Sequence, residues 1–237
     1  RGDLDKNLDD FEILSVSKYN GKSRLKNPMD DTLVPIIQYE KLEDVATDFL
    51  RDIFPEALRI PMRGQAPAWV DPTVLANKME LTIKSQRIRK DASVFGQIYF
   101  DDTDAEMYDA TADADVPTHI KGKTIVVDPQ MYLLRNLGSI NNTIVHECVH
   151  WHKHRKAFKL EKLFNADASH ISCEVLGEAD SRISIKSTQY MERQANQLAP
   201  RIQMPKEPFT IKAKEYIAYF MKHTNAKHTV DVMEMVI

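Results

Sequence analysis

The stretch NNTIVHECVHWHKH (141–154) contains the pattern HExxH, which begins at His146. Residues four apart on an α-helix are separated by about 400° of rotation, so His146 and His150 can direct two imidazoles at one ion. Zinc binds neutral histidine nitrogens at about 2.0–2.1 Å. Glu147 lies about 100° around the same helix, where it can act as a general base beside the ion. The pattern therefore predicts metal-assisted hydrolysis, with His146 and His150 as zinc ligands and Glu147 as the catalytic base.

The remaining polar side chains of this stretch are not expected to bind the ion. Cys148 lies about 200° from both ligand histidines, and we expect it to face the core as a small buried hydrophobe. His152 and His154 are also predicted to lie off the ligand face, as surface or capping residues. Basic residues follow at the C-terminal end of the helix, where positive charge interacts favourably with the helix dipole. We prefer this interpretation to a nucleic-acid-binding patch.

A catalytic zinc usually has three protein ligands and one open position, so one ligand must come from elsewhere. The downstream candidates are His170, Glu174, Glu178, Asp180 and Glu192. Glu192 has the best setting because it lies in a segment with the apolar periodicity of a helix that has one buried face. The apolar positions of that segment are Met191, Ala195, Leu198 and Ile202. The alternative is that Glu192 is an ordinary solvated helix residue.

Two further roles are expected around the metal. Asn196 is one helical turn beyond Glu192, where its amide can hold a ligand histidine by the second ring nitrogen. Peptide hydrolysis also needs a group that stabilises the oxyanion. The candidates are Tyr190, His170 and Arg193, and the sequence does not choose among them.

The surrounding pattern predicts an α+β fold with a few short strands between helices. Helical periodicity is found in 39–54, 71–79, 137–158, 186–199 and 210–224. Strand-like segments are 80–88, 93–100 and 123–129. The acidic segment 101–122 lacks the spaced ligands of an EF-hand, so we expect a solvated loop rather than a calcium site.

The composition excludes several classes of protein. A net charge of −3 argues against a nucleic-acid-binding surface, and no apolar run approaches the length of a membrane helix. The N-terminus has no apolar leader, and the cysteines Cys148 and Cys173 form no disulfide framework. We therefore expect a cytoplasmic protein without a membrane partner and without direct nucleic-acid binding.

HECVH followed by E-x-x-A-N-x-x-A-x-x-I-x-M-P, which begins at Glu192, resembles the ImmA/IrrE family of zinc metallopeptidases, which are gluzincins. The upstream segments DPTVLANKMELTI and TIVVDP are also similar to that family, so the resemblance covers about 70–205. It implies a zincin-like fold, a minimal gluzincin whose small sheet packs beside the HExxH helix and a second ligand-bearing helix. It also implies that His146, His150 and Glu192 bind zinc.

The family resemblance further implies a bacterial endopeptidase that takes part in transcription regulation by cleaving a helix-turn-helix repressor. One alternative is a zinc-containing binding module that sequesters a repressor without hydrolysis. Another is a toxin-like protease that acts on a host protein.

Three regions are expected along the chain. Residues 1–39 form an N-terminal extension or arm, 40–205 the metallopeptidase domain, and 206–237 a C-terminal helical segment. Because members of the family often continue beyond this point, we expect the C-terminal segment to be truncated. Two departures from the family pattern are the cysteine at position 148 and the 42-residue gap before Glu192.

Overall fold

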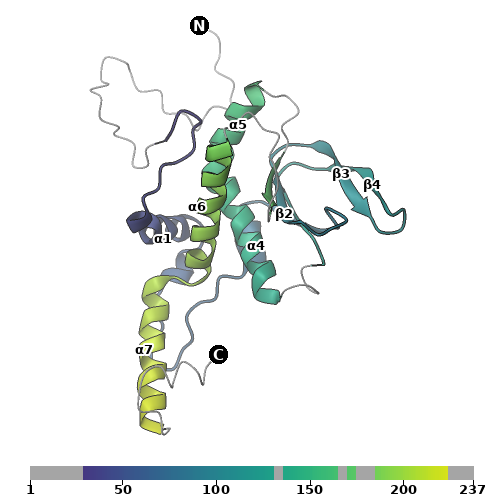
Figure 1. Cartoon of the computed structure of the whole chain (residues 1–237). Coiled ribbons are helices and arrows are strands. Elements are labelled where there is room, and N and C mark those ends of the chain that lie inside the picture. The colour runs from purple at the N-terminus through teal and green to yellow at the C-terminus, as the bar shows by residue number, and fades with distance from the viewer. Residues whose placement is uncertain (1–28, 131–135, 165–169, 175–184, 224–237) are drawn as a thin grey trace, which may run out of the picture.

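The computed structural model describes residues 29–130, 136–164, 170–174 and 185–223 (Figure 1). For residues 170–174, 185 and 186 it describes the backbone alone. The fold is mixed α+β, as the sequence predicts, with a small sheet and several helices. Three predictions fall outside the described residues. They concern most of the N-terminal arm, the ligand candidates Glu178 and Asp180, and the end of the C-terminal segment.

The main sheet has four strands in the order β1-β5-β2-β6. Their bounds are Thr82–Ser85 (β1), Thr124–Val127 (β5), Val94–Tyr99 (β2) and His170–Glu174 (β6). β1 runs parallel to β5, whereas β2 is antiparallel to both of its neighbours. The three strands predicted upstream of the HExxH helix are therefore confirmed, and β6 is an additional edge strand from the segment that follows that helix.

The acidic segment after β2 is a β-hairpin and not the solvated loop that its composition predicts. β3 (Thr103–Asp109) pairs antiparallel with β4 (Ala114–Ile120), and the hairpin projects from the main sheet (Figure 1). Met107 and Ile120 are almost fully buried in a small apolar cluster beside the sheet. The two buried side chains therefore anchor a ribbon whose other residues are mostly polar.

The helices have the following bounds: Leu42–Ile53 (α1), Pro72–Lys78 (α2), Leu137–Val149 (α4), Arg155–Phe164 (α5), Ile185–Gln203 (α6) and Lys206–His223 (α7). α2 begins as predicted, since the Asp71 carboxylate accepts hydrogen bonds from two backbone N–H groups of its first turn. None of the described helices is both long enough and apolar enough to cross a membrane.

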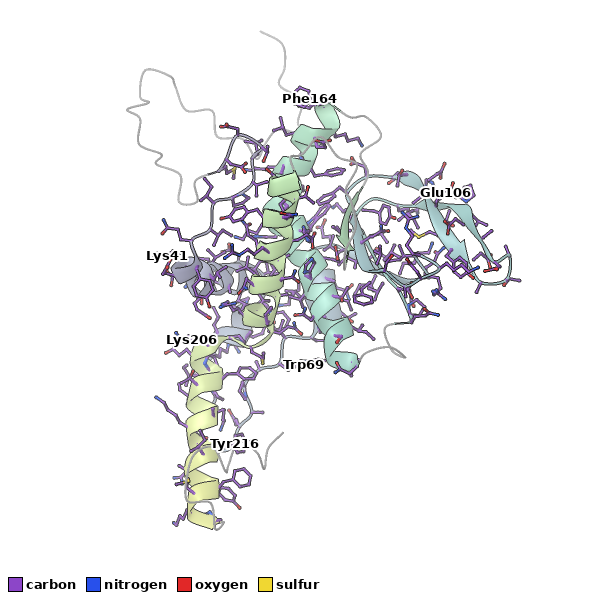
Figure 2. The ribbon with its side chains drawn as sticks, viewed as in Figure 1. Lys41, Trp69, Glu106, Phe164, Lys206 and Tyr216 are labelled. Carbon is purple, nitrogen blue, oxygen red and sulfur yellow. The ribbon has the colours of Figure 1, made fainter. Side chains whose placement is uncertain are left out.

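The core lies where α4 and α6 pack against each other and α4 packs on β2 (Figure 1). Every residue of α4 from Thr143 to Val149 is buried, including Cys148, whose thiol is free as predicted. The apolar stripe predicted for α6 is also buried, with Met191, Ala195, Leu198 and Ile202 each at most 1% exposed. The helix continues through Pro200 to Gln203. In contrast, α7 extends away from this core, and Tyr216 near its far end is exposed (Figure 2).

Candidate metal centre

Helices α4 and α6 bring His146, His150 and Glu192 together as a candidate metal-binding cluster. Each residue offers one ligand atom, and these atoms all lie within 4.8 Å of one another. His146 Nε2 is 3.1 Å from Glu192 Oε2, and His150 Nε2 is 3.2 Å from Glu192 Oε1. The two Nε2 atoms are 2.9 Å apart. The convergence of two imidazoles and a carboxylate matches the ligand set predicted from the sequence.

The position of each candidate ligand follows from the helix that carries it. His146 on α4 and His150, the first residue of the π-helical turn that continues α4, are one turn apart on the side that faces α6. Ala195 on α6 is fully buried, and a small residue there allows the two helices to approach closely. Their close packing places Glu192 opposite both imidazoles, 42 residues after His150 in the sequence.

The donor set fits a divalent cation. Burial lowers the pKa of His146, although Glu192 acts in the opposite direction. The lowered pKa favours the neutral imidazole that a metal requires. Burial raises the pKa of Glu192, but the nearby His150 and His146 outweigh it, so the net pKa lies well below its usual range. Glu192 Oε1 is buried and forms no hydrogen bond in the described part of the chain. A cation between these atoms would bind the lone pairs of the two imidazole nitrogens and the carboxylate.

Glu147 lies beside the cluster with its side chain fully buried. Neither carboxylate oxygen has a hydrogen-bond partner of good geometry among the described residues. Burial raises the pKa of Glu147 well above its usual range, and the charge of Glu192 adds to the effect. The backbone N–H of Ile98 acts weakly in the opposite direction. A carboxyl group in such a site is suited to take up and release a proton.

Gly96 on β2 is a residue of this site that the sequence analysis missed. A Cβ atom added there would lie 2.5 Å from Thr143 Cγ2 and 3.1 Å from Glu147 Oε1. The absence of a side chain therefore lets α4 pack directly on β2 and leaves room for the Glu147 carboxyl. A glycine inside a strand pattern is the signal that could have identified it, because such glycines often mark a close backbone approach.

We expect Gly96→Ala to lower the free energy of unfolding by about 1–3 kcal/mol, because the new methyl overpacks the contact between β2 and α4. Thermal unfolding of the metal-free protein measures the effect. The double variant Gly96→Ala/Thr143→Ser removes the methyl group that the new Cβ meets first. It should recover most of the lost stability, and a double variant no more stable than Gly96→Ala would show that the clash is not the cause.

Asn196 lies near the cluster, as expected. The residue is largely exposed, yet its side chain hydrogen-bonds His146 and raises the pKa of that ring slightly. The contact is consistent with the predicted role in holding a ligand histidine.

The candidates for oxyanion stabilisation receive little support. The Tyr190 hydroxyl donates its proton to the Ile37 carbonyl at 3.1 Å and accepts from the Ile37 N–H, so in this structure that proton is engaged elsewhere. Arg193 is exposed on α6. His170 lies in the edge strand β6 opposite Tyr99, and its side chain is outside the described part.

The prediction that His154 is a surface or capping residue is wrong, because its side chain is fully buried. The chain continues from α4 into one π-helical turn, His150–His154, before α5 begins. His154 lies four residues after His150, so its ring is one turn further along and is fully buried, tilted against the His150 ring with the two Nδ1 atoms 2.9 Å apart. Single π turns inside helices are frequent at functional sites. His152 points elsewhere, with its ring edge-on to Phe49.

Comparison with known families, curated proteins and solved structures found no match to this chain. The arrangement of the metal cluster and the sequence motifs are therefore the observations on which a function is proposed.

Proposed function

We propose that the chain is a zinc-dependent endopeptidase with a zincin-like, minimal gluzincin architecture. The observation that carries the proposal is the convergence of His146, His150 and Glu192 next to the buried carboxyl group of Glu147. Two histidines and one glutamate are the ligand set of catalytic zinc sites in hydrolases, which leave a position open. An isolated pair of surface histidines would not be almost completely buried beside a carboxylate.

His146, His150 and Glu192 would hold the ion. Zinc bound there would supply a Lewis acid that polarises the scissile carbonyl and lowers the pKa of water from 15.7 toward about 7. Glu147 would take the proton from the attacking water at one carboxylate oxygen and then release it to the leaving amine. Because its carboxyl group is buried without a fixed hydrogen bond, either oxygen is available for this transfer.

The proposed substrate is a protein, a helix-turn-helix repressor, and the proposed setting is the cytoplasm of a bacterium. The support for this part of the proposal is the motif pair HExxH and E-x-x-A-N, which resembles the ImmA/IrrE family and whose residues His146, His150 and Glu192 lie close enough together to hold an ion. The same support extends to membership of that family and to a role in transcription regulation.

Removal of the metal tests this function. The zinc-loaded protein is incubated with any helix-turn-helix repressor that is encoded beside its gene, and the products are separated by size. We expect two fragments of the repressor, no fragments after chelation of zinc, and full recovery when one equivalent of zinc is added back. An intact repressor held in a stable complex would instead identify the non-hydrolytic binding module. A chelated protein that still cleaves would contradict the role of the metal.

A further inference from the structure

A chain of hydrogen bonds leads from His150 to the N-terminal segment, through residues that the proposed mechanism does not use. His150 Nδ1 lies 2.9 Å from His154 Nδ1, and His154 Nε2 lies 3.0 Å from Gln194 Oε1. Gln194 Nε2 donates to the Pro35 carbonyl at 2.5 Å. All four residues are buried, so water does not compete for these bonds.

The direction of every bond in this chain follows from its last member. The Pro35 carbonyl can only accept, which turns the amide nitrogen of Gln194 toward it and the amide oxygen toward His154. His154 must therefore carry a proton on Nε2. The His154 ring is fully buried, and its Nε2 partner is an uncharged amide, so a second proton on the ring would be costly and its Nδ1 is an acceptor.

An acceptor at His154 Nδ1 determines the tautomer of His150. The Nδ1 atom of His150 must donate to it, which leaves the lone pair on Nε2. That Nε2 atom is the one that lies beside His146 and Glu192 in the candidate metal centre. The hydrogen-bond chain thus ends in a lone pair that is directed at the position of the ion.

We propose that His154 and Gln194 are positioning residues that lock His150 in the metal-binding tautomer, with the Pro35 carbonyl as the fixed end. The inference rests on the proposed zinc site and deepens it, because it makes the N-terminal segment a structural part of the metal centre. A histidine free to exchange tautomers and rotate would offer its Nε2 lone pair only part of the time, so the metal would bind more weakly.

The N-terminal segment 29–38 is attached to α6 at other points as well. Tyr190 hydrogen-bonds both backbone groups of Ile37, and Thr32 Oγ1 lies 3.3 Å from Ser187 Oγ. Figure 1 shows this purple segment passing beside α6 on its way to α1. These contacts hold the segment without touching His154, so they allow a control that loosens the segment but leaves the hydrogen-bond chain complete.

Four variants of the full chain test the proposal by zinc affinity, measured in competition with a fluorescent zinc chelator. His154→Leu and Gln194→Met each interrupt the chain with a side chain of similar size, and we expect zinc affinity to fall about 10- to 100-fold. His154→Asn keeps an acceptor oxygen where Nδ1 was, but its side chain is too short to reach Gln194. We expect it to bind zinc more tightly than His154→Leu and more weakly than the wild type. Tyr190→Phe, the control on α6, removes the hydrogen bonds to Ile37 without touching His154 and should stay close to the wild type.

The results separate the failure of this inference from the failure of the proposed function. A wild-type chain that binds no zinc would contradict the zinc site itself. If the wild type binds zinc, equal affinity in Gln194→Met, or a loss in His154→Asn as large as in His154→Leu, overturns the positioning role. Thermal unfolding of each metal-free variant shows whether it folds. If His154→Leu does not fold, the zinc affinity of Gln194→Met decides the outcome.

Nitrogen NMR of the zinc-loaded wild type gives a readout that a merely structural role would not fix. We expect His150 to carry its proton on Nδ1 and His154 to carry a single proton on Nε2. A proton on Nδ1 of His154 would reverse the direction of the chain and overturn the inference.

Discussion

The variant Glu147→Gln is expected to lose about 10²- to 10⁴-fold in the rate of peptide hydrolysis and to keep its zinc. Glutamine has the same shape as glutamate but cannot take up the proton of the attacking water. Neither oxygen of Glu147 has a hydrogen-bond partner of good geometry in the described part of the chain, so the exchange should disturb little beyond the weak contact with the Ile98 N–H. Single-turnover cleavage of the repressor, together with zinc analysis of the same sample, measures both quantities.

Glu161→Gln is the matched control for this variant. Glu161 is another buried glutamate, one of whose oxygens has no hydrogen-bond partner among the described residues, but it lies on α5, outside the candidate metal-binding cluster. The same chemical change there should leave the rate of cleavage unchanged. Cleavage by Glu147→Gln at the wild-type rate would show that Glu147 is not the catalytic base.

The second large effect is expected for Glu192→Ala. Because the carboxylate contacts both ligand histidines, its removal takes away one ligand and the only negative charge that the cluster directs at the ion. Loss of an indirect partner typically costs 10- to 100-fold in metal affinity, and we expect the loss of a direct ligand to exceed about 100-fold. Zinc content after dialysis against a chelator measures the change, and hydrolysis should disappear with the zinc.

A control for charge is available at the start of α7. Glu207→Ala removes the same group from an exposed position and should leave zinc content at the wild-type level. Full retention of stoichiometric zinc by Glu192→Ala would refute the two-helix site.

Much of the candidate site could be predicted because helical periodicity converts spacing into direction. The four-residue spacing of the HExxH histidines placed them on one face, and the apolar stripe of α6 placed Glu192 opposite them. The same periodicity should have placed His154 below His150. The π-helical turn that follows α4 has no signal in the local sequence, and it was not predicted.

The parts that could not be predicted depend on contacts between residues far apart in the chain. The hydrogen bond from Gln194 to Pro35 joins positions separated by 159 residues, and no local pattern indicates it. The edge strand β6 is assigned through its pairing with β2, again across a long sequence separation. The sequence predicts a loop for the acidic hairpin because most of its residues are polar. Met107 and Ile120 anchor it through contacts in a buried cluster, which the local sequence does not indicate.

Zinc K-edge X-ray absorption of the one-to-one zinc complex tests the metal centre most directly, because it reports the atoms bound to the ion. We expect a shell of nitrogen and oxygen atoms at about 2.0–2.1 Å with the outer scattering of two imidazoles. Cys148 is buried in the core and should contribute nothing. A sulfur atom at about 2.3 Å, or fewer than two imidazoles, would contradict a site formed by His146, His150 and Glu192.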